Sequence, residues 1–323
     1  MTSLSVVVPA TDRPPTLGRC RAAIEASTER PVELIVVDSP ATLSAVEARN
    51  RGAERARGEV VVFVDADVEI HADALARIGA AFDADPGLSA VHGSYDDSPR
   101  ARGLVSVFRN LLHHHVHQAG AGPAVTFWTG LGAVRRSDLL AVGGFDAVRY
   151  QHPSIEDIEL GHRLAATGRR LRLDPEIQGT HLKRWTLRSM LFTDFARRGV
   201  PWVALQMRTR QVATTLNCGW RHRMSAAVCA LGPLAVLLGL PLVALVALAS
   251  LVGLNRGFYA LLARELGVLQ ASVCVALHGL HHLVSVAAVP VGIAVGLAAA
   301  VGSFRSRRAS RLGPAQLDGS VTS

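Results

Sequence analysis

The sequence predicts an α/β domain with a mostly parallel sheet, followed by an α-helical transmembrane region of about two spans. Short valine-rich runs alternate with helical patterns in the N-terminal part, which is typical of parallel strands joined by crossover helices. From about Ser225 the composition changes: residues 225–254 hold no charged side chain, and residues 271–303 hold none apart from three histidines. An α/β domain joined to a very apolar part explains how 49% of the residues are hydrophobic while 19% are still charged.

The elements follow from these runs and from the residues that stop them. The predicted strands are residues 4–8, 32–37, 59–64 and 88–95, and the predicted helices are residues 15–28, 41–57, 72–84 and 100–119. Extended segments are expected at 124–135 and 170–180, around a helix from about Ile155 to Gly168, and another helix near 186–199. The first three strands end at Pro9, Asp38 and Asp65, where the chain leaves the sheet. Because ligands of open α/β sheets bind outside the carboxyl ends of the strands, Asp38, Asp65 and Asp67 are expected to meet in one crevice.

The net charge, the cysteines and the first residues indicate which partners and which compartment to expect. The formal net charge is +8, mostly from arginine, which suits nucleic acid, an anionic membrane surface or a phosphorylated substrate. The four cysteines form no CxxC pair and are interpreted as free thiols in a reducing compartment; they are Cys20, Cys218, Cys229 and Cys274. The first residues lack a basic stretch and a long apolar run, so no signal peptide is expected and the N-terminal part should stay in the cytoplasm.

The two apolar segments predict a membrane hairpin. A spanning helix needs about 20 apolar residues, and both segments exceed that length. Arg221 and Arg223 precede the first segment, and basic residues between Arg305 and Arg311 follow the second. Positive-inside asymmetry therefore places both termini in the cytoplasm, in a multi-pass protein of the plasma (inner) membrane. Internal prolines leave the alternatives open that a segment is kinked or breaks into two half-spans.

Asp65-Ala66-Asp67 follows the strand VVVFV directly. At a strand end both carboxylates can turn into the crevice. Hard oxygen ligands suit Mg²⁺ or Mn²⁺, which usually bridge to substrate phosphates. The alternative is a pair of solvated loop aspartates, but the context favours a metal site.

A second acidic group opens the helix near Ile155. Acidic residues in a first helical turn often only complement the helix dipole. A positioned carboxylate can also serve as a general base, and Asp157 is the favoured candidate for it. Glu156 and Glu159 are then expected to be structural neighbours.

Arg197, Arg198 and Trp202 lie just before the apolar part. Arginine forks match diphosphate oxygens, but a basic collar against lipid headgroups is equally supported. His113 and His117 have i, i+4 spacing, yet no third metal ligand is evident, so an acceptor-facing or interfacial role is favoured.

Three more histidines share one face of the second apolar segment, and neutral imidazoles bonding to the first segment are favoured over an ionisable function; they are His278, His281 and His282.

Several functional classes find no support. The chain has no GxxxxGK[ST] loop, no glycine-rich turn after its first strand and no GxSxG elbow. Its arginines are scattered through helices without an aromatic platform, which argues against nucleic acid as a partner.

The order of these motifs resembles family 2 glycosyltransferases with a GT-A fold, a Rossmann-like nucleotide-diphospho-sugar transferase fold. The matching pieces are SVVVPA at 5–10, VELIVVD at 32–38, ARNRGAERARGEVVVFVDADV at 48–68, TGLGAVRRSDLLAVGGFD at 129–146 and IEDIELGHRL at 155–164. Together they span residues 5 to about 202, and this ordered set is more specific than any single motif. The resemblance and the composition together divide the chain into a catalytic domain (1–205), a juxtamembrane linker (206–224), a transmembrane hairpin (225–304) and a basic, polar cytoplasmic tail (305–323).

The resemblance implies an inverting transfer from a nucleotide-sugar donor. By this analogy the donor contacts are Pro9, Ala10, Asp38, Arg49 and Asp65, and the metal ligands are Asp65 and Asp67. Asp157 matches the second residue of the family's Glu-Asp motif, its catalytic base, with Glu156 beside it. The expected acceptor or phosphate contacts are Trp128, Thr129, Gly130, Arg198 and Trp202.

The sequence departs from the family in three places. Ser-Pro-Ala follows Asp38 in place of Asp-x-Ser-x-Asp, which leaves the nucleotide open. No Gln-x-x-Arg-Trp motif is present, as in non-processive members. His181 is a candidate third metal ligand or phosphate contact.

Two spans are few for a polymer channel, so the expected reaction moves one sugar to a lipid or lipid-linked acceptor. Candidates are a polyprenyl phosphate, a diacylglycerol-type lipid or a hopanoid-like lipid. The alternatives are a processive polysaccharide synthase and an inactive GT-A scaffold or nucleotide-sugar binder.

Overall fold

The computed structural model describes residues 1–210 and 219–311, and side chains as far as residue 300. Its strands are β1 (Leu4–Pro9), β2 (Glu33–Val37), β3 (Val60–Val64), β4 (Val68–Ile70), β5 (Leu88–Tyr95), β6 (Gly122–Ala124), β7 (Leu131–Arg135) and β8 (Arg170–His181). The helices of the α/β part are α1 (Leu17–Glu25), α2 (Ala45–Arg55), α3 (Ala74–Ala84), α4 (Leu104–Ala119), α5 (Arg136–Ala141), α6 (Glu156–Ala166), α7 (Leu187–Phe192), the π-helix η1 (Thr193–Gly199) and α8 (Val200–Thr209). Four helices follow, α9 (Trp220–Leu237), α10 (Pro241–Leu254), α11 (Arg256–Leu266) and α12 (Val268–Arg311).

The strands form one sheet in the order β2-β1-β3-β7-β5-β8-β4, with β6 paired to β8. The three N-terminal strands are parallel, with β1 between β2 and β3. β7 runs antiparallel to β3 and β5, β4 and β6 run antiparallel to β8, and β5 is parallel to β8. The carboxyl ends of β1, β2 and β3 therefore lie at one edge, where the predicted crevice residues begin.

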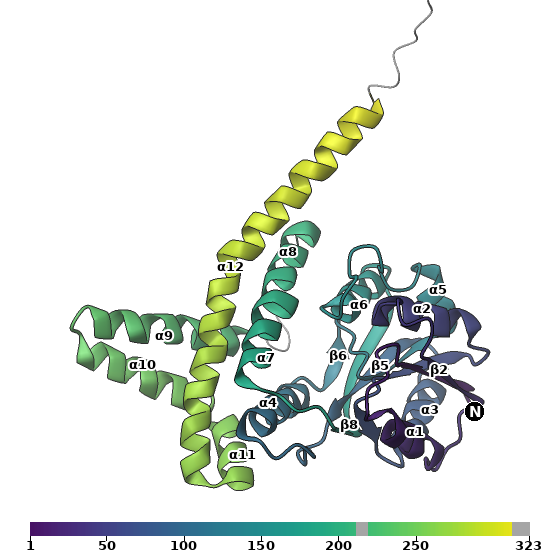
Figure 1. The fold of residues 1–323 in the computed structure, drawn as a ribbon, viewed down its shortest axis with the longest axis horizontal. Helices are drawn as coiled ribbons and strands as arrows, with labels where there is room; N and C mark the ends of the chain where they lie inside the picture. Colours follow the sequence, from purple (N-terminus) through teal and green to yellow (C-terminus); the bar gives the residue numbers. More distant parts are fainter. Residues whose placement is uncertain (211–218, 312–323) are drawn as a thin grey trace, which may run out of the picture.

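Helices cover both faces of the sheet (Figure 1). One core joins α1 and α3 to the sheet through Ile24, Ile78 and Phe82. The opposite core holds residues of α2, α5, α6 and α8, among them Leu160 and Leu205. This two-layer covering explains why the strands are apolar along both faces rather than alternating.

Most predicted elements are confirmed to within a few residues. The strand at 88–95 has the predicted bounds, and the predicted helix at 186–199 is an α-helix that continues as a π-helix. Four elements were not predicted: β4, α5, α8 and α11. The first two are three and six residues long, too short to show a periodicity. Cys20, Cys229 and Cys274 are free and buried, and Cys218 lies outside the described residues.

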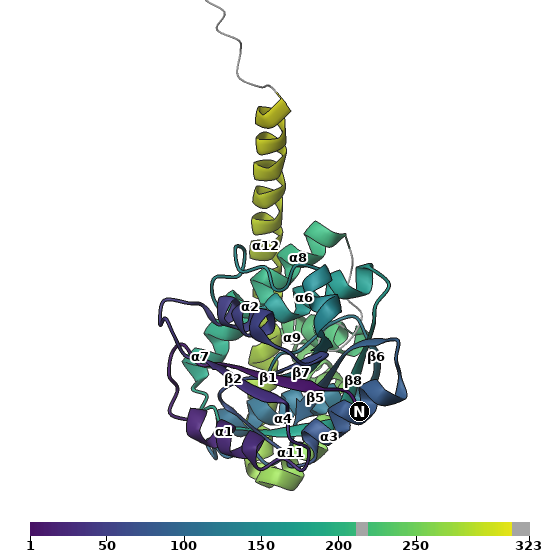
Figure 2. The ribbon, with the colours of Figure 1, turned by 90° about the vertical axis from the view of Figure 1, so that its right-hand side faces the viewer.

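The first apolar segment is not one continuous helix. It divides into α9 and α10 at residues 238–240, where Gly239 has a φ of +70°. α10 and α11 then meet at a bend of 76°. Of the described helices, only α12 contains a continuous stretch long and apolar enough to cross a bilayer, Val268–Ala300. α9 and α10 lie side by side and run crosswise to the long α12, away from the α/β domain (Figure 1). The C-terminal part of α12 projects beyond the other elements (Figure 2). The polar tail predicted after Arg311 lies outside the described residues.

Gly161 allows α6 to pack closely against the backbone of Thr126 and Phe127. A Cβ atom at this position would lie 2.4 Å from the backbone nitrogen of Phe127. We expect Gly161→Ala to destabilise the protein by about 1–3 kcal/mol, because neither backbone can move without disturbing the sheet. Thermal unfolding in detergent measures this. Gly18→Ala in α1 is the matched control, since a methyl group added there would have no atom within 4 Å, and an unchanged Tm for Gly161→Ala would contradict the packing argument.

Candidate active site

The two aspartates after β3 are held by backbone hydrogen bonds from neighbouring segments. The Asp65 amide donates to the Gly130 carbonyl at 3.2 Å, and the Leu182 amide donates to the Asp67 carbonyl at 2.8 Å. The pairing of β4 with β8 sets Val68 opposite His181. As a result the His181 Nε2 lies 3.7 Å from Asp67 Oδ2. Burial raises the pKa of Asp67, but the nearby His181 and the charge of Lys183 outweigh burial and hold that pKa below its ordinary value.

Arg49 joins this strand end to the acidic helix α6. Its side chain is 5% exposed, and its two terminal nitrogens donate to Asp65 Oδ1 and to Glu156 Oε1, each at 2.8 Å. Glu156 is 3% exposed and also accepts a hydrogen bond from the Ser154 amide at 2.7 Å. Both Glu156 oxygens are therefore engaged, so this residue positions Arg49 and the start of α6.

Asp157 occupies the next position on α6 and points into the cavity. Its Oδ1 accepts from the Ile158 amide at 2.8 Å, and its Oδ2 lies 3.3 Å from the Thr129 amide. Burial and the neighbouring charge of Glu156 raise the pKa of Asp157 to about 7, although Arg49 acts against this shift. A carboxylate with such a pKa suits proton transfer near neutral pH.

These groups line a cavity of about 820 Å³. Its wall beside Asp67 is aromatic: the rings of Tyr95 and His181 stack at 4.1 Å, and Trp128 packs against Tyr95 and His113. His113 and His117 also line it, as the prediction of an acceptor-facing role requires. Burial lowers the pKa of both imidazoles, that of His117 to about 4, so both are neutral at pH 7.

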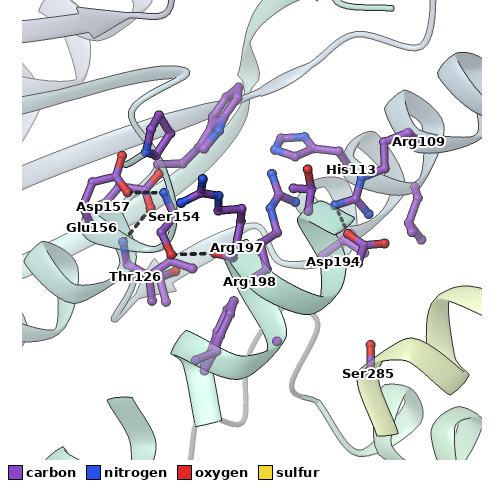
Figure 3. Close-up of a pocket in the computed structure, with 18 of the residues that line it drawn as sticks. Arg109, His113, Thr126, Ser154, Glu156, Asp157, Asp194, Arg197, Arg198 and Ser285 are labelled. Atoms are coloured by element: carbon purple, nitrogen blue, oxygen red, sulfur yellow. Dashed lines mark hydrogen bonds and ion pairs between the residues drawn. The ribbon is translucent and has the colours of Figure 1, made fainter. Parts of the chain in front are cut away.

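The cavity extends from the carboxylates to the C-terminal helices. Figure 3 shows Glu156 and Asp157 at one end, Arg109 and Asp194 at the other, and Arg197 and Arg198 between them. Beyond Asp194 the lining residues come from α9 and α12, and they are His222, Arg223, Ala226, His281, Ser285, Val286 and Val289. One space thus joins the acidic centre to the apolar part of the chain.

Asp194 of η1 contacts both the α/β domain and the C-terminal helix α12. It is 4% exposed, and its two oxygens contact Arg109 of α4 at 2.6 Å and His281 of α12 at 2.8 Å. Burial raises the pKa of Asp194, but the Arg109 charge outweighs it and holds the pKa well below its ordinary value. Two of the three α12 histidines hydrogen-bond elsewhere than predicted: His281 contacts η1, and His278 contacts the Tyr259 hydroxyl of α11 at 2.9 Å. The third, His282, packs its ring against that of His222 at the start of α9, 4.5 Å away.

The predicted site residues separate into two groups. Lining the cavity are Arg49, Asp65, Asp67, Trp128, Thr129, Glu156, Asp157, His181, Arg198 and Trp202. Pro9, Ala10 and Asp38 are not among its lining residues but lie at the carboxyl ends of β1 and β2, where the Ala10 amide donates to the Val37 carbonyl. Gly130 is not among the lining residues either. A Cβ atom at this position would lie 2.2 Å from the Trp128 ring, so the glycine leaves the space that this ring occupies. Sequence reasoning missed Arg109 and Asp194, whose only signal was charge within otherwise apolar helical stretches.

Asp65 and Asp67 fit a divalent cation whose remaining ligands come from the substrate. Asp65 and Asp67 are about one-third exposed toward the cavity, and Arg49 engages only one Asp65 oxygen. Among the described residues no group of three His, Cys, Asp or Glu side chains is arranged to hold a metal alone. Two carboxylates completed by phosphate oxygens are a usual arrangement for Mg²⁺.

The comparison with known families decides the class. The model of glycosyl transferase family 21 matches residues 20–285. The chain belongs to glycosyl transferase family 21. It is therefore a glycosyltransferase, and the resemblance to family 2 identified the right activity and fold but not the right family.

Two solved structures are similar to the chain. A mannosyltransferase, PcManGT from Pyrobaculum calidifontis, solved with GDP-Man and Mn²⁺, is 18% identical with a TM-score of 0.50, over 92% of this chain and 87% of that one. GalNAc-T7, solved with UDP, GalNAc and Mn²⁺, is 14% identical with a TM-score of 0.45, over 65% of this chain and 52% of that one. The first match supports the predicted GT-A fold. No curated protein matches the chain.

The Arg49 bridge makes a testable prediction about stability. Arg49→Met leaves Glu156 charged and buried without its partner, so we expect a loss of about 3–5 kcal/mol in the free energy of unfolding. Arg51→Met on the exposed face of the same helix should change it by less than about 0.5 kcal/mol. Denaturant unfolding followed by circular dichroism measures both. The double variant Arg49→Met/Glu156→Gln should recover part of the loss, and a single variant as stable as the parent would refute the bridge.

Proposed function

We propose that this glycosyltransferase moves a sugar, with inversion, from a nucleotide-sugar donor to a lipid or lipid-linked acceptor at the cytoplasmic face of the plasma membrane. The observation that carries the proposal is the single cavity, which begins at Asp65, Asp67 and Asp157 and ends among residues of α9 and α12. An acceptor with a hydroxyl or phosphate head and an apolar tail fits such a space at both ends.

Donor binding is assigned to the strand-end acidic residues. Asp65 and Asp67 would hold Mn²⁺ or Mg²⁺, which when bound neutralises the diphosphate and eases its departure. Support comes from the GT-A fold and from the Pyrobaculum calidifontis enzyme of the same fold, which was solved with GDP-Man and Mn²⁺. Lys183 and Arg198 line the same cavity and supply positive charge for diphosphate oxygens. Pro9, Ala10 and Asp38, at the neighbouring strand ends, are proposed for the nucleoside.

Asp157 is proposed as the general base. Its Oδ2 takes the proton of the acceptor hydroxyl while that oxygen attacks the anomeric carbon of the sugar. The bond from the anomeric carbon to the diphosphate breaks, and its electron pair leaves with the nucleoside diphosphate. Attack opposite the leaving group inverts the configuration, and the hydrogen bonds from Thr129 and Ile158 hold the carboxylate in place for it.

Replacing the base tests this assignment. We expect Asp157→Asn to lower kcat by about 10²–10⁴-fold, because the amide cannot accept the proton. Transfer of radiolabelled sugar to lipid measures the loss, and unchanged donor affinity and membrane retention show that the protein is intact. Glu159→Gln, two residues further on the same helix, is the control. Near-normal turnover in Asp157→Asn would exclude this residue as the base.

The pH profile gives an independent test. Because the base must be deprotonated and the pKa of Asp157 is raised to about 7, kcat/KM should fall about tenfold per pH unit below pH 7. Activity should be level above that pH until another group titrates. A profile that stays level down to pH 5 would contradict a base with this pKa.

A donor screen tests the whole proposal. The purified protein is incubated with a panel of nucleotide sugars and membrane lipid extract, and lipid-linked sugar is scored with Mn²⁺, with Mg²⁺ and after chelation. We expect one labelled lipid product that is lost with chelator and restored by metal, and a higher metal requirement in Asp67→Asn. A ladder of oligomers would instead favour a processive synthase, and nucleotide-sugar binding without transfer would favour an inactive scaffold.

A further inference from the structure

The α9–α10 pair presents an apolar surface that has no partner within the described part of the chain. Its side chains near the turn are well exposed, for example Leu237 (83%), Leu242 (72%) and Val236 (65%). Soluble proteins rarely expose a continuous apolar surface of this kind. Arg221 at the start of α9 and Arg256 after α10 place positive charge at the base of the pair. An apolar tip above a basic base fits a leaflet with anionic headgroups.

Neither helix of the pair is long enough to cross a bilayer. The uncharged part of α9 runs from Ser225 to Leu237, and α10 has 14 residues, so each measures about 20 Å at 1.5 Å per residue. The hydrocarbon core is about 30 Å thick. The pair can therefore enter a membrane and return, but it cannot reach the far side.

The segment after the pair returns to the catalytic domain. Phe258 and Leu262 of α11 are buried in one cluster with Phe108 and Leu111 of α4. Arg264 of α11 also contacts Asp97 at 3.0 Å. In a hairpin of two spans, residues 255–267 would lie on the opposite face of the membrane from the active site. Their packing on α4 places them on the same face.

The long helix α12 also stays with the catalytic domain. A Cβ at Gly292 would lie 2.5 Å from Val203 of α8, so these two helices pack closely. α8 in turn buries Leu205 in the sheet core and brings Arg208 to 4.0 Å from Glu159. An α12 that crossed the membrane with its whole apolar length would carry these charged residues into hydrocarbon, which is costly.

We infer that the C-terminal helices bind one leaflet only: the α9–α10 pair dips into it, and α12 lies along it with its packed face on the catalytic domain. This replaces the multi-pass arrangement expected from the sequence, and it rests on the membrane attachment in the proposed function. His222 and Ala226 of α9 line the active-site cavity. An acceptor dissolved in that leaflet would therefore reach Asp157 without crossing the membrane.

The deciding measurement is on which face of the membrane α11 lies. Ala260→Cys (α11) and Ala80→Cys (α3) both introduce an exposed thiol, and the unsubstituted protein sets the labelling baseline. A membrane-impermeant maleimide is applied to intact cells and to inverted membrane vesicles. We expect both variants to label above baseline in inverted vesicles and neither in intact cells. Labelling of Ala260→Cys from the face opposite to Ala80→Cys would overturn the inference.

Depth of the turn is the second measurement. Leu238→Cys and Ala260→Cys are each labelled with an environment-sensitive fluorophore, and the protein is reconstituted into vesicles that contain nitroxide lipids. We expect deep acyl-chain nitroxides to quench the fluorophore at 238 several-fold more strongly than the one at 260. Equal weak quenching at both would show that the pair does not insert and would overturn the proposal.

The outcomes separate this inference from the function on which it rests. Protein that does not sediment with membranes would defeat membrane attachment itself. Protein that sediments and transfers sugar, but shows Ala260→Cys on the far face, would leave the proposed function standing and defeat only the one-leaflet arrangement.

Discussion

The buried guanidinium of Arg49 is the constraint on which the acidic centre depends. Asp65, Asp67, Glu156 and Asp157 line one cavity, and four carboxylates so close would repel one another. Arg49 pairs with one of them at the end of β3 and with another at the start of α6. It thereby fixes the distance between the proposed metal side and the proposed base. Arg49 also limits the pKa of Asp157, which burial and the charge of Glu156 raise and the charge of Arg49 lowers.

A second buried ion pair fixes the relative positions of the elements at the other end of the cavity. Asp194 is held by Arg109 from the catalytic domain and by His281 from α12. Asp194 lies in the π-helix that also carries Arg197 and Arg198. The contact of Asp194 with His281 of α12 therefore helps to fix the positions of these two arginines. π-Helical turns are rare and frequently occur at functional sites. The C-terminal helices are thus part of the site rather than an anchor added to it.

Local patterns were sufficient to predict the parts of the site that one stretch of sequence defines. Asp65, Asp67 and Asp157 each follow a recognisable strand end or open a helix, and all three line the cavity. Contacts between distant segments left no such trace: Arg109 and Asp194 are brought together only by folding. The internal prolines left open that the first apolar segment breaks in two, but hydropathy could not place the break at Gly239, where φ is +70°, because apolar residues continue on both sides. The motifs predicted the right activity but the wrong family, since the family model that matches the chain is that of family 21.

The placement of the C-terminal helices bears on the kind of product. A synthase that extrudes a polymer needs a path through the bilayer lined by spanning helices. On the one-leaflet arrangement no described helix supplies such a path, since α9 and α10 are too short and α12 is packed along the catalytic domain. The cavity instead joins the acidic centre to α9 and α12, which the one-leaflet arrangement places on the proposed cytoplasmic face. A product formed there stays in the leaflet that supplied the acceptor, which favours transfer of a single sugar to a lipid over processive synthesis.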